Sequence, residues 1–189
     1  MAFITLVEVR DMIAMTLAVG FIFMHLFRKP QSDDPVENLR NQKAWHSQLL
    51  FSMALVAPPL ILHELGHKFL AMSMGFSATF KAAYFWLGLG VLLKLVSFPF
   101  LIIVPAFVSI IGQATPLQNS LIAFAGPGVN LALWVLSMLV LKLASLKRGA
   151  QVFWSYFKII NLFLFVFNML PIPGFDGFQV YLGLWQSFV

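Results

Sequence analysis

Two histidines four residues apart, with a glutamate between them, are the residues of this sequence best suited to chemistry. They are His63, Glu64 and His67 in the stretch LILHELGHKFLA, residues 60–71. On a helix, positions i and i+4 lie one above the other on the same face, so both imidazoles can bind one metal ion. The glutamate lies about 100° further round the helix, beside the ligand row rather than in it. This HExxH pattern is typical of two zinc ligands and a general base.

The same stretch has a purely structural alternative. The two histidines could hydrogen-bond to backbone groups inside a helical bundle, with Glu64 paired to Lys68 one turn later. Burying two imidazoles and a carboxylate among apolar residues without a functional gain is costly. The metal-binding interpretation is therefore favoured.

A third metal ligand can be sought by elimination. A catalytic zinc site takes three protein ligands and leaves one position for water. Asp176 is the one acid that follows the motif, although an aspartate in a loop rich in proline and glycine can also be a simple turn former. A histidine ligand at position 73 is excluded by Ser73, and the chain has no cysteine. The acids before the motif lie at the start of the first hydrophobic segment or in a polar loop, and they are Glu8, Asp11, Asp33, Asp34 and Glu37.

The composition is that of a membrane protein. Of the 189 residues, 60% are hydrophobic and 10% are charged, whereas a soluble domain is about half apolar and a quarter charged. A chain of this length has room for roughly four to six transmembrane helices. The net charge of +5 comes from basic residues scattered through loops and segment ends, which suits lipid headgroups and argues against a nucleic-acid partner.

The hydrophobic pattern predicts an all-α polytopic membrane protein with one short strand-like segment. That segment, near 98–112, is rich in β-branched residues and contains Pro99 and Pro105, so it is a poor transmembrane helix. It could offer a strand edge to an extended substrate, or it could be a buried connector. The expected hydrophobic segments are 12–27, 47–75, 84–97, 118–141 with an early interruption at 126–128, and 152–170.

Three motifs together resemble the site-2 protease family of intramembrane zinc metalloproteases, in the form of its minimal archaeal-type members. They are HELGH at 63–67, GPGVN at 126–130 and NMLPIPGFDG at 168–177. The resemblance covers about residues 48–180, the expected catalytic core of a single membrane-embedded metalloprotease domain spanning 1–189. Gly174 stands where proline is usual in the family and Phe175 where leucine is usual.

The resemblance implies a role for each matching residue. It assigns one Zn²⁺ per chain to His63, His67 and Asp176, with Glu64 as the catalytic general base. It also implies that Asn130 and Asn168 help to hold the active centre or the substrate. For Asn130, a plain hydrogen bond between helices is the alternative.

The function expected from this resemblance is hydrolysis of peptide bonds within or near transmembrane segments of other proteins. The expected partners are a transmembrane protein substrate and the lipid bilayer, with the chain an integral, multi-pass protein of the cell membrane. The alternative is a zinc-binding membrane transporter or sensor that uses the same two histidines and aspartate. A base such as Glu64 beside an open metal position favours the protease. A prenyl-protein protease would need a later glutamate as ligand, and none follows.

Overall fold

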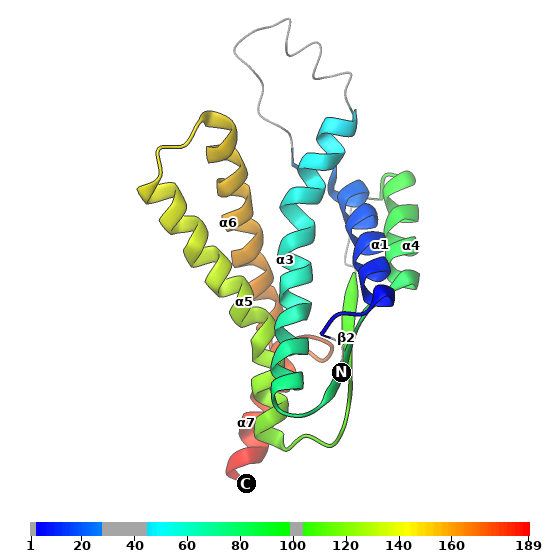
Figure 1. The fold of residues 1–189 in the computed structure, drawn as a ribbon, viewed down its shortest axis with the longest axis vertical. Helices are drawn as coiled ribbons and strands as arrows, with labels where there is room; N and C mark the ends of the chain where they lie inside the picture. The colour runs from blue at the N-terminus through cyan, green and yellow to red at the C-terminus, as the bar shows by residue number, and fades with distance from the viewer. Residues whose placement is uncertain (1–2, 28–44, 99–103) are drawn as a thin grey trace, which may run out of the picture.

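The structure is a computed structural model that describes residues 3–27, 45–98 and 104–189. Over these residues the chain forms six helices and one two-stranded sheet (Figure 1). The predicted all-α class with a small strand component is therefore confirmed. In chain order the elements are α1 (Leu6–Phe23), α3 (Trp45–Ser73), β1 (Ser77–Ala82), α4 (Tyr84–Leu95), β2 (Ala106–Ile111), α5 (Pro116–Leu143), α6 (Arg148–Asn168) and α7 (Asp176–Phe188).

Three of the helices in the described ranges, α3, α5 and α6, are long and apolar enough to cross a membrane. Residues 12–23 of the first predicted segment, 12–27, lie in α1, and residues 24–27 follow its end. α1 begins earlier than predicted, with a capping box between Thr5 and Glu8 at its N-terminus. α1 has 18 residues, but three charged residues lie in its first two turns. α4 has only 12 residues, about 18 Å at 1.5 Å per residue, which is less than the hydrocarbon thickness.

Helix α3 is the central element of the fold. It lies between α1 and α4 on one side and α5 and α6 on the other, and α7 lies at the end of the molecule where α5 begins (Figure 1). α3 packs against α1, α5 and α6, while α7 packs against α5. The buried apolar cluster joins α1, α3 and the sheet through residues such as Met15, Leu55 and Phe80, which are fully buried. Many large apolar side chains are exposed on the outer helix faces, as expected of surfaces that meet lipid.

The predicted interruption of the fourth hydrophobic segment at 126–128 is wrong. α5 is one continuous helix that includes Pro127. It starts with a capping box between Thr115 and Gln118 and has Pro116 in its first turn, where a proline is well tolerated. Packing against α3, α6 and α7 stabilises the helix beyond the proline, and neighbouring helices commonly allow this in membrane proteins.

The sheet consists of β1 and β2, paired antiparallel with Phe80 opposite Val108 and Lys81 opposite Phe107. β2 lies inside the strand-like segment predicted at 98–112, of which residues 99–103 are outside the described part of the chain. β1 was not predicted. It begins just after α3, which ends at a left-handed Gly75 (φ 89°) with the Phe76 N–H donating to the Ala71 carbonyl. This turn directs the chain back, so that both strands pack against α3.

Candidate metal centre

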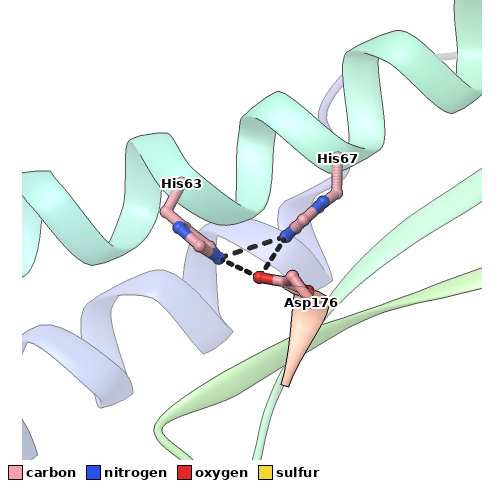
Figure 2. Close-up of side chains that lie close together, drawn as sticks. All are labelled: His63, His67 and Asp176. Atoms are coloured by element: carbon pink, nitrogen blue, oxygen red, sulfur yellow. Dashed lines mark hydrogen bonds and ion pairs between the residues drawn. The ribbon is translucent and has the colours of Figure 1, made fainter. Parts of the chain in front are cut away.

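The three predicted metal ligands lie together, although they come from different parts of the chain. His63 and His67 project from α3, and Asp176 is the first residue of α7 (Figure 2). The Nε2 atoms of the two histidines are 3.1 Å apart. The Asp176 Oδ2 atom lies 3.1 Å from His63 Nε2 and 3.4 Å from His67 Nε2. One potential metal-ligand atom from each residue therefore points to a common centre.

A sharp turn between α6 and α7 places Asp176 at this centre. Residues 169–175 are not helical, and Gly174 adopts a left-handed φ of 99°. α7 then starts so close to the end of α6 that a Cβ at Gly177 would collide with the backbone of Met169. The prolines at 171 and 173 cannot continue the preceding helix, so the local sequence forces the chain to turn where the aspartate is needed.

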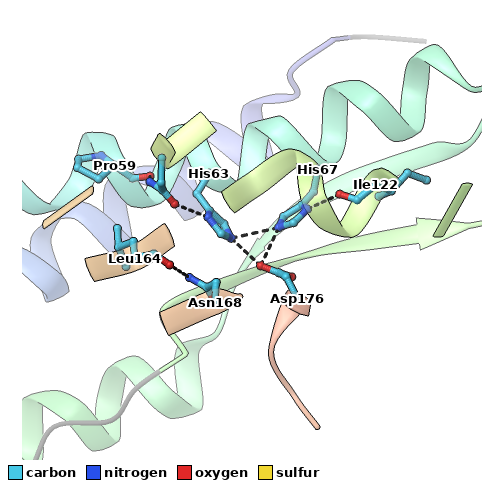
Figure 3. Close-up of polar contacts among 8 residues, drawn as sticks. Pro59, His63, His67, Ile122, Leu164, Asn168 and Asp176 are labelled. Carbon is cyan, nitrogen blue, oxygen red and sulfur yellow. Dashed lines mark hydrogen bonds and ion pairs between the residues drawn. The ribbon is translucent and has the colours of Figure 1, made fainter. Parts of the chain in front are cut away.

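The hydrogen bonds on the far side of each imidazole fix which nitrogen faces the centre. His63 Nδ1 lies 2.6 Å from the Asn130 Oδ1 atom. His67 Nδ1 lies 2.7 Å from the Ile122 carbonyl oxygen (Figure 3). Both oxygens are acceptors, so each Nδ1 donates its hydrogen and each Nε2 keeps a lone pair. This arrangement of outer partners is characteristic of histidines that bind metal ions.

The geometry fits a zinc ion. Tetrahedral zinc with bonds of about 2.0–2.1 Å places its ligand atoms about 3.3 Å apart, close to the separations found here. The backbone of α5 also approaches the donors closely at Gly126, where a Cβ would lie 2.7 Å from His63 Nε2 and closer still to His67 Nε2. Two neutral imidazoles and one carboxylate form a three-ligand set that leaves a fourth position open, as catalytic zinc sites do.

Glu64 lies beside this group and is partly exposed. The structural alternative, in which Glu64 pairs with Lys68, is wrong because Lys68 forms a buried ion pair with Glu8 of α1. No hydrogen bond or ion pair joins the Glu64 carboxylate to another residue in the described ranges. The carboxylate is therefore available to accept a proton from a reacting molecule.

Asn130 connects the centre to two further elements. Besides the contact with His63, its Nδ2 donates to the Pro59 carbonyl at 3.2 Å and to the Asn161 Oδ1 at 3.1 Å. The hydrogen bond between helices that was considered as the alternative for Asn130 is thus present together with the contact to a ligand. Asn168 instead donates to the Leu164 carbonyl within α6 at 2.9 Å, and no dashed line joins it to the histidines or the aspartate (Figure 3).

Asn161 is a residue of this site that the sequence analysis missed. It is fully buried, its Nδ2 donates to the Phe157 carbonyl at 2.8 Å, and its Oδ1 accepts from Asn130. Because this acceptor holds the Asn130 amide nitrogen, the Asn130 oxygen is left facing His63. An amide in the otherwise apolar run of residues 159–167 was the available signal, since such groups need partners inside a membrane.

Replacing Asn161 by leucine should weaken zinc binding on the order of tenfold, because outer partners that orient a ligand typically contribute 10- to 100-fold. The measurement is the zinc dissociation constant of the purified protein in competition with a chelator. Asn168→Leu is the matched control for zinc binding, since it is the same substitution in the same helix at a residue whose amide donates to the Leu164 carbonyl rather than to a partner of a ligand, and it should retain the parent affinity. Equal affinities of Asn161→Leu and the parent would contradict the role of Asn161.

Comparisons with known proteins agree with this site. The model of Peptidase family M50 matches residues 140–189, which include Asp176. Over 188 residues the chain is 37% identical to "Putative zinc metalloprotease MJ0611" of Methanocaldococcus jannaschii, covering 96% of this chain and 86% of the relative. It is also 35% identical over 134 residues to "Putative zinc metalloprotease Rip2" of Mycolicibacterium smegmatis, covering 63% of this chain and 51% of that protein. No solved structure matches the chain.

The first of these relatives decides the family, because the similarity extends over almost the whole chain and includes the helix of the two histidines and the turn before Asp176. This finding confirms the resemblance to the site-2 proteases that the three motifs indicated. The chain belongs to peptidase family M50.

Proposed function

We propose that this chain is an intramembrane zinc endopeptidase that cleaves peptide bonds within or near transmembrane segments of other proteins. The family membership and the relatives named as zinc metalloproteases support a metalloprotease. The observation that carries the proposal is the grouping of His63, His67 and Asp176 beside a partly exposed Glu64, on a helix long and apolar enough to cross a membrane. The chain is then a multi-pass protein of the cell membrane.

The proposed chemistry divides between the metal and the chain. Bound zinc supplies a Lewis acid that polarises the scissile carbonyl and makes water a better nucleophile near neutral pH. Glu64 accepts a proton from the attacking water and delivers it to the leaving amine. Asn130 and the Ile122 carbonyl hold the two imidazoles in the tautomer that turns Nε2 toward the ion.

The edge of β2 is the proposed docking site for an extended substrate segment. In a pair of antiparallel strands, every second residue of each strand directs its backbone N–H and C=O groups away from the partner strand. Phe80 N–H points away from β2, toward Glu8, so Val108 opposite Phe80 and Ile110 opposite Ala78 point theirs away from β1. A substrate strand added there would hydrogen-bond to these groups, and it would have the extended backbone that a protease needs.

Substituting proline for Ile110 should reduce cleavage roughly tenfold and leave zinc content unchanged, because proline deletes one outward N–H donor worth about 0.5–1.5 kcal/mol. The measurement is kcat/KM on a cleaved single-span protein, with metal content as the check on folding. Ile110→Val keeps the donor and the β-branched shape, so it should cleave at the parent rate. A proline variant with unchanged turnover would support the connector alternative for this segment.

The proposal is tested most directly by zinc analysis of the purified protein, combined with cleavage assays on a panel of single-span transmembrane proteins in lipid vesicles. The Glu64→Gln variant is the control, since it should bind zinc without cleaving. One equivalent of zinc and specific cleavage would support the protease. One equivalent of zinc, no cleavage of any panel member and zinc flux across the vesicle would support the transporter alternative.

A further inference from the structure

Two carboxylates of α1 are buried against the strand β1. Glu8 is 1% exposed and Asp11 is 4% exposed. One Glu8 carboxylate oxygen accepts from the Phe80 backbone N–H at 2.8 Å, and one Asp11 oxygen accepts from the Ala82 N–H at 3.2 Å. Helix α1 therefore bonds to the backbone of β1 through side chains rather than through a third strand.

These two N–H groups are the outward donors of β1. Phe80 lies opposite Val108 and Ala82 opposite Ala106, and both pairs are of the kind that do not exchange hydrogen bonds across the ladder, so their N–H groups point away from β2. α1 packs on β1 and occupies the place that an additional strand would take. The outer edge of β1 is closed, whereas in the described part of the chain α1 does not cover the outer edge of β2 in this way.

Both carboxylates make further bonds. The Glu8 oxygen that accepts from Phe80 also pairs with Lys68, which is 1% exposed and directly follows His67. The other Glu8 oxygen accepts from the Thr5 N–H at 2.8 Å. Asp11 accepts from the Tyr84 hydroxyl at 2.7 Å and pairs with Arg10 at 2.9 Å. The network thus joins α1 and β1 to the helix that bears the two histidines. Apolar residues at positions 8 and 11 would leave the Phe80 and Ala82 N–H groups without these acceptors, which is costly for buried backbone groups.

We propose that Glu8 and Asp11 are positioning residues that close the edge of β1, so that a substrate strand adds to the edge of β2. The inference rests on the proposed function, since it assumes that an extended substrate adds to the sheet. In this arrangement the two carboxylates leave only the β2 edge for the substrate, and the Glu8–Lys68 pair holds the sheet at a fixed place relative to the histidine ligands.

Two variants, each with three substitutions, distinguish the role of the carboxylates as hydrogen-bond acceptors at the β1 edge from their role in charge pairs. In the first, Glu8→Gln, Lys68→Met and Asp11→Asn remove the charges but keep an amide oxygen to accept from each N–H. In the second, Glu8→Ala, Lys68→Met and Asp11→Ala remove the charges, the acceptors and most of the side-chain volume that lies against the β1 edge. Neither variant leaves a buried lysine without its partner, which would itself destabilise the fold. Metal content and amide hydrogen exchange of residues 77–82 report folding and the state of the β1 edge without depending on activity.

Cysteine cross-linking then reports which edge the substrate occupies. The chain has no cysteine, so single cysteines at Lys81 on β1 and at Phe107 on β2 are unambiguous probes. These two residues are direct cross-strand partners with exposed side chains. The probe is a single-span protein from the panel that the parent chain cleaves, carrying one cysteine near its cleavage site. Oxidative cross-linking is measured in the Glu64→Gln background, where binding is observed without turnover.

With the parent residues at positions 8, 11 and 68, the substrate should cross-link at Phe107→Cys and little at Lys81→Cys. The variant without acceptors should expose the β1 amides to exchange and lower the ratio of Phe107 to Lys81 cross-links roughly tenfold, since two hydrogen-bonding sites become available on the wrong edge. The variant with amide acceptors should retain the parent ratio.

The possible failures are distinguishable. If the parent chain cross-links at neither position while it still cleaves the substrate, strand addition itself is wrong and the proposed docking fails. If the parent cross-links at Phe107→Cys and both variants keep that ratio, the edge closure by Glu8 and Asp11 is overturned. If both variants shift the ratio equally, the charge pair rather than the hydrogen-bond acceptors controls docking, and the inference is also overturned.

Discussion

Replacing Asp176 by alanine is expected to abolish proteolysis and to remove most of the bound zinc. Two neutral imidazoles alone leave the divalent charge uncompensated in a surrounding of low dielectric constant, and they leave the ion with one ligand fewer than a catalytic zinc site takes. Asp176→Asn should be intermediate, because its amide oxygen still reaches the centre but carries no charge. Zinc per mole of protein, measured by plasma spectrometry, is the readout for the parent and both variants.

The matched control is Gln179→Ala, which removes an exposed polar side chain from the same helix and should keep one equivalent of zinc. His63→Ala and His67→Ala should lose zinc as Asp176→Ala does. If Asp176→Ala retained a full equivalent while the two histidine variants lost it, the third ligand would have to lie elsewhere. The distances of 3.1 and 3.4 Å from Asp176 to the imidazoles would then reflect only an ion pair.

The second large effect is expected from Glu64→Gln, which should stop proteolysis while zinc remains bound. Glutamine preserves the shape of the side chain but cannot accept a proton, and loss of a general base typically costs at least ~10²-fold in rate. The rate on a cleaved single-span protein and the metal content are measured on the same preparation.

Glu64→Asp is an informative companion variant, since it keeps the base but withdraws it by one methylene, and it should retain part of the activity. Full activity of Glu64→Gln would refute the protease mechanism. Loss of zinc from Glu64→Gln would instead identify Glu64 as a ligand, which would conflict with the fit of a three-residue set to the observed donor spacing.

The sequence by itself determined those features that depend on local spacing and on composition. His63 and His67 must share a helix face because they are four residues apart. The apolar composition required a membrane protein, and the prolines and glycine at 171–174 required a turn before Asp176. The choice of Asp176 as third ligand followed from the absence of another acid after the motif. None of these inferences needed knowledge of which helices are neighbours.

Only the tertiary structure decided the features that depend on pairings between distant residues. Lys68 had Glu64 as its obvious local partner, yet it pairs with Glu8, 60 positions earlier in the chain. Asn161 reaches the centre only through Asn130 on another helix.

The strand β1 and the continuity of α5 were decided in the same way. β1 forms because β2 and the carboxylates of α1 satisfy its backbone on both sides. α5 continues through Pro127 because three helices pack against it. In each case the stabilising partner is remote in sequence, and inside a membrane a polar group takes whichever partner the fold brings near, because no water is there to satisfy it.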